Sequence, residues 1–153
     1  MEVYEIVAAM RQRKEEQAVR NDLELRVAKQ ADEAFEDLRT ELCQQFTAQI
    51  ESLNQYGQAG LRWIPNADGK NVEVNQDDSG KTLTITFSPS FRCVSFNYAG
   101  GKVFKRSLTV KMETISGLLR TREHFCYVKE DKTRLPQDGV ASYVGDLLAL
   151  LMV

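Results

Sequence analysis

The first 56 residues contain neither glycine nor proline, and no other feature of the chain constrains its fold as much. Alanine, glutamate, glutamine, leucine and arginine dominate this run, and all five favour helix. In its second half the apolar residues recur every three or four positions, at Ala28, Ala31, Phe35, Leu38, Leu42, Phe46, Ile50, Leu53 and Tyr56. That spacing is typical of one helical face. It predicts a long amphipathic helix from Ala28 to Tyr56 that stops at Gly57.

A second, shorter apolar stripe lies near the N-terminus, where Val3, Ile6, Val7 and Met10 have the spacing of one helical face. The seven residues that follow, 11–17, are all polar, so nothing apolar anchors a helix there. Short isolated helices are marginal in water. Two alternatives stay open: the helix of residues 1–56 projects and finds a partner, or it bends or frays near residues 11–20. In both cases the stripe needs an apolar surface to cover it.

Between residues 61 and 129 the period of the apolar residues changes from about 3.6 to 2, which is the period of a strand. Four short runs carry the signal, at 71–75, 82–88, 94–98 and 107–112, and a fifth run, 124–128, is apolar on both parities. Glycine, proline, serine and aspartate separate the runs and indicate turns. Short connections favour antiparallel neighbours, because a parallel pair needs a long crossover. The pattern predicts an antiparallel meander of about five strands, each with one buried face.

The last segment, 136–153, is predicted to form a C-terminal helix. Its apolar residues share one helical face: Val140, Tyr143, Val144, Leu147, Leu148 and Leu151. Gly145 interrupts this face and favours a close packing contact there. A sheet with one buried face needs a cover, and this helix and the Phe35 to Leu53 stripe are suited to provide it. We therefore predict an α+β fold, with residues 1–153 forming a single domain.

Composition narrows the class of protein. The chain has 153 residues, of which 42% are hydrophobic, and this is enough to build a core. The apolar tail at 147–153 is far shorter than the roughly 18–20 residues that a membrane span needs, so we expect no membrane association. The N-terminus is acidic where a secretory signal is basic. Three widely spaced cysteines, Cys43, Cys93 and Cys126, form no complete disulfide framework and indicate a reducing, cytoplasmic setting.

Three features suggest chemistry but lack the residues that it needs. Ser79-Gly80-Lys81-Thr82 resembles the end of a phosphate-binding loop, yet Asn75 stands where that loop needs its first glycine, and a strand follows. His124 is the only histidine, and Cys126 lies two residues away on the same strand face, but no second cysteine or further metal ligand lies close in sequence. Adjacent carboxylates such as Glu15-Glu16 point apart on a helix. We therefore predict a non-enzymatic protein with no catalytic residue, cofactor or metal.

Charge is distributed unevenly along the chain. Residues 1–57 carry 7 Lys+Arg and 12 Asp+Glu, a net charge of −5, whereas the remainder has a net charge of +3. Residues 79–112 contain no acidic side chain, and their basic residues include Arg92, Lys102, Lys105, Arg106 and Lys111. Aromatic residues lie among them, as in sheets that bind single-stranded nucleic acids. A structural interpretation is that lysine and arginine protect an exposed sheet edge, while the rings of Phe96 and Tyr98 point into the core. A further interpretation is that the acidic helix pairs with the basic sheet, either within one chain or between two copies.

Two functions of different class follow. The first is an interaction or scaffold module that self-associates as a homodimer through Val3, Ile6, Val7 and Met10, or uses them to bind a helical protein partner. The alternative is a nucleic-acid-binding accessory protein that uses the basic stretch. We rank the first ahead of the second, because a sequence pI near 5.5 is unlike that of a dedicated nucleic-acid binder.

Overall fold

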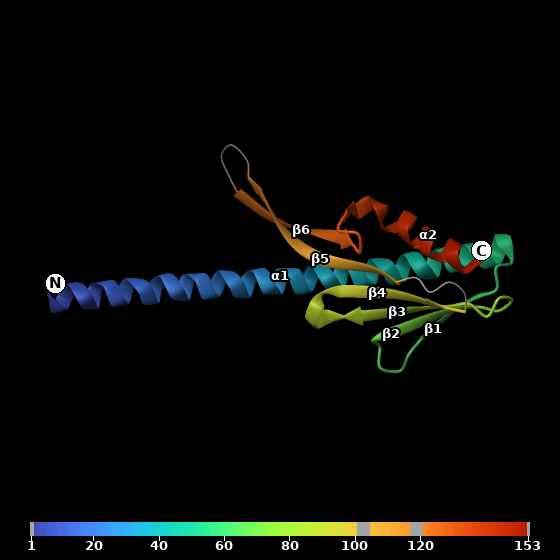
Figure 1. The fold of residues 1–153 in the computed structure, drawn as a ribbon, viewed down its shortest axis with the longest axis horizontal. Coiled ribbons are helices and arrows are strands. Elements are labelled where there is room, and N and C mark those ends of the chain that lie inside the picture. The colour runs from blue at the N-terminus through green and yellow to red at the C-terminus, as the bar shows by residue number, and fades with distance from the viewer. Residues whose placement is uncertain (1, 101–104, 117–120, 153) are drawn as a thin grey trace.

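The computed structural model describes residues 2–100, 105–116 and 121–152, with side chains at all of these positions except 114–116 and 121–124. The fold is α+β, as the sequence predicted. A long N-terminal helix, α1, is followed by a sheet of seven strands and a C-terminal helix, α2 (Figure 1). Two side-chain features named above lie outside the described residues, namely Lys102 and the side chain of His124.

Helix α1 runs without interruption from Val3 to Gly57. Glu2 and Glu5 form a capping box at its start, in which the backbone N–H of Glu2 donates to the Glu5 carboxylate at 3.3 Å. Gln58 adopts the left-handed conformation and ends the helix, at the place that Gly57 predicted. Residues 11–20 are helical throughout, and side-chain hydrogen bonds four residues apart link the polar positions there. Of the two alternatives, the structure has the continuous, projecting helix.

The seven strands form one antiparallel meander in which each strand pairs with the next along the chain. Their bounds are β1 Leu61–Pro65, β2 Asn71–Gln76, β3 Thr82–Ser88, β4 Cys93–Ala99, β5 Lys105–Ser116, β6 Thr121–Lys129 and β7 Arg134–Leu135. The prediction of about five strands was two short. The additional strands are β1, which ends at a proline, and β7, which has two residues. Strand β1 shows no strict alternation of buried and exposed residues, and β7 is too short to show any period.

Helix α2, Val140–Met152, follows a single turn of 3₁₀ helix at Gln137–Gly139. Both helices pack against the same face of the sheet, because Phe96 of β4 contacts Phe46 of α1 and Tyr143 of α2, at ring centroid distances of 6.2 and 5.7 Å. The hydroxyl of Tyr98 donates to the carbonyl oxygen of Leu147 at 2.6 Å and ties β4 to α2. The two helices therefore cover the apolar face of the sheet, as predicted.

The two helices also touch each other. Gln49 of α1 donates its side-chain amide to the carbonyl oxygen of Ala141 at 2.8 Å. A Cβ atom added at Gly145 would lie 3.3 Å from the Gln49 Oε1 atom, which is closer than most Cβ contacts in proteins. This confirms that Gly145 marks a close approach, here between α1 and α2.

The opposite face of the sheet has no helix over it in the described structure, and it is polar. Its partly exposed side chains include Thr82, Thr84, Thr86, Ser95, Asn97, Ser107 and Thr109. The apolar residues that alternate with them, among them Leu83, Ile85 and Val94, are fully buried. Such alternation is what a sheet with one solvent-facing side requires.

The Ser79-Gly80-Lys81-Thr82 segment lies in the turn between β2 and β3. The backbone N–H of Gln76 donates to the carbonyl oxygen of Lys81 at 3.0 Å, which closes the hairpin. Gly80 has a φ of +67°, a conformation that glycine adopts without strain. Strand β3 follows directly, so no helix N-terminus is present to bind phosphate. The segment is a hairpin turn, as its sequence context predicted.

We expect Gly100→Ala to destabilise the protein by about 1–2 kcal/mol. Gly100 has a φ of +90°, and an added Cβ atom would lie 3.1 Å from the carbonyl oxygen of Gly80 and the Cα atom of Lys81. Neither backbone atom has room to move without shifting the β2–β3 hairpin. Gly57→Ala is the matched control, because nothing lies within 4 Å of its new Cβ atom. Urea unfolding that showed equal midpoints for the two variants would contradict this reasoning.

Candidate interaction surface

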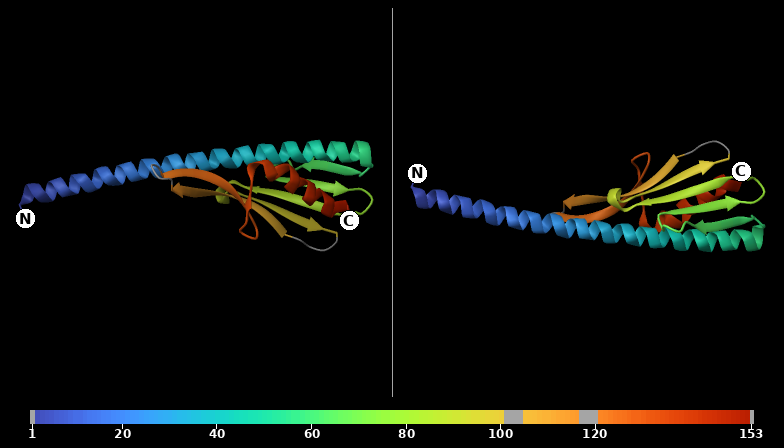
Figure 2. Two further views of the ribbon diagram at one scale, coloured as in Figure 1. Left: turned by 90° about the horizontal axis from the view of Figure 1, so that it is seen from above. Right: turned by 90° about the horizontal axis from the view of Figure 1, so that it is seen from below.

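The N-terminal part of α1 extends beyond the sheet. Every described residue from 2 to 26 is exposed, and the first buried residue of the helix is Ala31. Both views of Figure 2 show the helix continuing well past the last strand. At a rise of 1.5 Å per residue, residues 2–26 span about 36 Å. This length of helix gains no stability from the core of its own chain.

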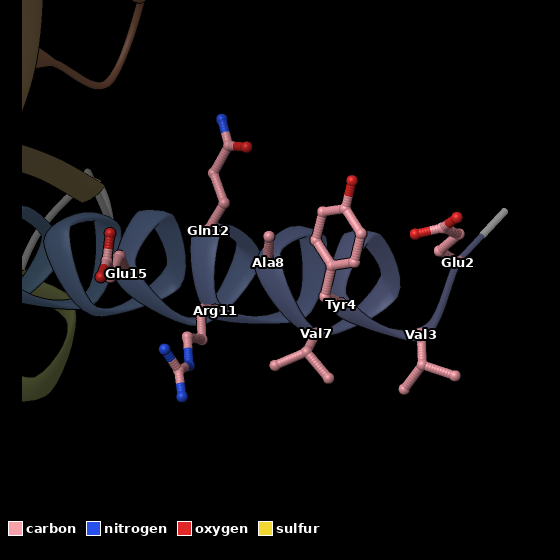
Figure 3. A pocket seen from close by; sticks show the side chains of 8 residues that line it. All are labelled: Glu2, Val3, Tyr4, Val7, Ala8, Arg11, Gln12 and Glu15. Atoms are coloured by element: carbon pink, nitrogen blue, oxygen red, sulfur yellow. The ribbon is translucent and has the colours of Figure 1, made fainter.

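The apolar stripe predicted from the sequence lies on this projecting segment, and we call Val3, Ile6, Val7 and Met10 the N-terminal stripe. Their exposed fractions are 77%, 44%, 42% and 54%. Figure 3 shows Val3 and Val7 on one side of the helix, with Tyr4, Ala8 and Gln12 on the other. The concave region in that view is bounded by α1 alone, so it is open helix surface rather than a cavity for a small molecule.

A second exposed apolar surface lies where α1 leaves the sheet. Strand β5 pairs with β4 only over residues 105–109, whereas residues 111–116 pair with residues 121–126 and with no other strand. This extension, which we call the β5–β6 arm, points toward the N-terminal half of α1 and rises away from it (Figure 1). The arm and the helix therefore diverge and leave a space between them.

We call this space the helix–arm groove. Its volume is about 390 Å³, and its lining is mainly apolar: Leu23, Val27, Ala28 and Ala31 from α1, with Val110, Met112 and Phe125 from the strands. Glu24 of α1 is the acidic residue of the lining. Arg92 lines it too, where its Nε atom binds Asp32 at 2.9 Å and its Nη2 atom donates to the carbonyl oxygen of Ala28 at 3.4 Å. The groove is a preformed apolar surface on the same helix as the N-terminal stripe.

Within the described ranges, the basic residues of the sheet are divided between its two faces, and Lys105 and Arg106 both border one shallow depression. Lys105 lies opposite Asn97 and Lys111 opposite Cys126, on the outer, polar side of the sheet. Arg106 lies opposite Phe96, on the side that faces the helices. Arg92 forms its ion pair with Asp32 of α1, which is one instance of the acidic helix lying against the basic sheet.

The remaining reactive groups are scattered. Cys43, Cys93 and Cys126 are free and half-buried. Burial raises the pKa of the Cys43 thiol, and burial together with the nearby Glu113 raises the pKa of the Cys126 thiol. Both thiols therefore stay protonated at neutral pH, and a thiol is a weak nucleophile. The described part of the chain contains no group of three or more His, Cys, Asp or Glu residues placed to bind a metal ion.

Sequence reasoning found the N-terminal stripe but missed the helix–arm groove. The run at 107–112 was predicted to be a strand. Its alternation does not indicate that Met112 lies beyond the end of the neighbouring strand β4. A weak signal was present, because residues 103–116 contain neither glycine nor proline, which leaves room for a strand longer than β3 or β4. The arm becomes evident only when the length over which β5 pairs with β4 is compared with the length over which it pairs with β6.

Comparison with known protein families, with curated protein sequences and with solved structures finds no match for this chain. Within the ranges that the structure describes, no helix combines the length and the apolar character needed to cross a lipid bilayer.

Proposed function

We propose that the protein is a non-enzymatic interaction module that self-associates through the N-terminal part of α1. The observation that carries the proposal is an uninterrupted helix whose residues 2–26 are exposed on every side and which carries an apolar stripe. Full burial of a Val, Ile or Met side chain contributes about 1.5–3 kcal/mol. Four such side chains in each copy offer enough to offset the entropic cost of association, which is roughly 4–15 kcal/mol.

The distribution of the basic residues supports this function over nucleic-acid binding. A backbone-tracking site needs several cations on one surface. Lys105 and Lys111 face away from the helices, Arg106 faces toward them, and Arg92 is engaged by Asp32. Nucleic-acid binding through these residues is therefore the competing function, and the tests below distinguish it from self-association.

The proposal predicts that the intact chain is a dimer and that Val7→Glu with Met10→Glu makes it a monomer. The two glutamates place charge in the middle of the N-terminal stripe, so the dissociation constant should rise at least about a hundredfold. Ala8→Glu with Gln12→Glu is the matched control, because it adds the same charge on the other side of the helix (Figure 3). Light scattering after size exclusion measures the mass of each, together with a chain that lacks residues 1–20.

A monomeric intact chain would refute self-association, and the stripe would then serve a different protein. Salt dependence separates the two classes of function. Phosphate-driven binding to single-stranded DNA weakens steeply between about 0.05 and 0.5 M salt, whereas apolar helix pairing does not weaken with salt. Binding to DNA that is lost in Lys105→Glu with Lys111→Glu would favour the nucleic-acid function instead.

A further inference from the structure

We propose that two copies of the chain pair antiparallel along α1, so that the N-terminal stripe of each copy occupies the helix–arm groove of the other. This inference rests on the proposed self-association and specifies its geometry. The occupant of the groove is a second copy of this chain, and the contact occurs twice, once at each end of the paired segment. Three features of the described residues carry it.

The first feature is the spacing of the two apolar surfaces along α1. In an antiparallel pair in which Gln17 lies opposite its own copy, residues 3–10 lie beside residues 24–31. Val3 then comes level with Ala31, and Val7 comes level with Val27. Ala31 and Val27 line the helix–arm groove. One register therefore brings the whole N-terminal stripe to the α1 wall of the groove.

The second feature is the order of charges on the exposed helix. Acidic and basic groups alternate in blocks between residues 2 and 29. The series begins with an acidic block at residue 2 and ends with a basic block at residue 29, so its reversed order has the opposite signs. In the register centred on Gln17, most charged residues lie near a residue of opposite charge: Glu5 comes level with Lys29, Arg11 lies between Asp22 and Glu24, and Glu15 lies beside Arg20. The like-charged exceptions are Lys14, which comes level with Arg20, and Glu2, which comes level with Asp32. A parallel pair in register instead places each block beside its own copy. Opposite charges across the seam of paired helices set their orientation.

The third feature is the position of the polar residues. The polar run at residues 11–17 separates the N-terminal stripe from the part of α1 that lines the helix–arm groove. In the antiparallel pair this middle lies at the two-fold axis and the apolar contacts flank it on both sides. The β5–β6 arm then covers the outer side of the partner's stripe, with Met112 and Phe125 as the strand-side wall. A helix alone offers no such wall, so in this arrangement the divergence of the arm from α1 makes room for the partner's helix.

Spin labels distinguish the two orientations. Two singly labelled variants are needed, both with the three native cysteines changed to alanine. In one variant the label replaces Val19, which is exposed and near the centre of the pair, and in the other it replaces Ala8. Labels at position 19 are close in either orientation. Labels at position 8 are separated along the axis by about 27 Å in the antiparallel pair and are level with each other in a parallel pair. Pulsed electron paramagnetic resonance on the full chain measures both distances.

A short distance at position 19 with a long distance at position 8 is the expected result. Short distances at both positions would overturn the antiparallel arrangement and leave self-association intact. A monomeric mass in light scattering, with no dipolar coupling at either position, would refute the proposed function and this inference together.

Occupancy of the groove has a separate test. Met112→Glu places a charge on the arm wall and should weaken dimerisation about tenfold or more. Ile64→Glu is the matched control, because Ile64 is also a strand residue with a similar exposed fraction, 38% against 43% for Met112, and is not among the groove-lining residues. Equal dissociation constants for the two variants, measured by sedimentation equilibrium, would show that the arm does not contact the partner.

Discussion

Replacing Phe46 by alanine should lower the free energy of unfolding by about 3–5 kcal/mol. The Phe46 side chain is fully buried, and its ring lies 5.7 Å from that of Trp63 and 6.2 Å from that of Phe96. The truncation leaves a cavity where α1, β1 and β4 meet. Domains of this kind are stable by only about 5–15 kcal/mol, so the loss is a large share of the total. Urea unfolding followed by the fluorescence of Trp63, the single tryptophan, measures it.

Phe91→Ala is the control for this substitution. Phe91 is 79% exposed, so its loss should change the free energy of unfolding by no more than about 0.5 kcal/mol. Both variants lose the same atoms, and only the surroundings differ. A cost below 1 kcal/mol for Phe46→Ala would mean that α1 does not pack on the sheet through this ring.

Raising the pH above about 10 should destabilise the protein through Tyr98 and Tyr143. Burial raises the pKa of both phenols above the ordinary value, and for Tyr143 the nearby Glu130 raises it further. The folded state therefore keeps these protons at pH values where the unfolded chain has lost them. The associated stability is complete below the unfolded pKa and is lost as the pH rises toward the folded pKa. Each such tyrosine contributes a decrease of about 1.4 kcal/mol per pH unit in that range.

Urea unfolding between pH 8 and about 11 tests this expectation, with phenylalanine substitutions to assign the effect. Tyr143→Phe should remove part of the pH dependence without a cost at neutral pH, because the Tyr143 hydroxyl is buried and has no hydrogen-bond partner among the described residues. Tyr98→Phe should also cost about 1 kcal/mol at neutral pH, because it removes the bond to the Leu147 carbonyl oxygen. Tyr56→Phe, at an 82% exposed position, should change neither. A pH dependence that is the same in all three variants would exclude Tyr98 and Tyr143 as its source.

The sequence predicted the helices and the central strands because each has enough turns or alternations to show its period. Six apolar positions from Phe35 to Leu53 define one face of α1, whereas Tyr56 at the end of the predicted stripe is 82% exposed. Strand β3 shows three buried residues in strict alternation. Strands β1 and β7 escaped prediction because Pro65 and the two-residue length of β7 leave no period to detect. Their pairing partners, rather than their own residues, make them strands.

The candidate interaction surface also has one part that the sequence predicted and one part that it did not. The N-terminal stripe is a local pattern, and Val3, Ile6, Val7 and Met10 were predicted from spacing alone. The helix–arm groove brings Ala31 together with Phe125, which lie far apart in the chain. Its existence depends on β5 and β6 extending beyond β4 and on the angle at which they leave α1.

By itself, the sequence determined the local features of this protein: a helix from the glycine-free run, an antiparallel meander from the alternation, and the apolar faces that must be covered. Hydrogen bonds within a helix and between neighbouring strands are set by residues close in the chain, so their periods can be read locally. The tertiary structure alone decided that α1 continues for about 36 Å beyond the sheet and that a groove lies where the helix leaves it. These depend on the relative lengths and packing angles of elements distant in sequence, which no local period records.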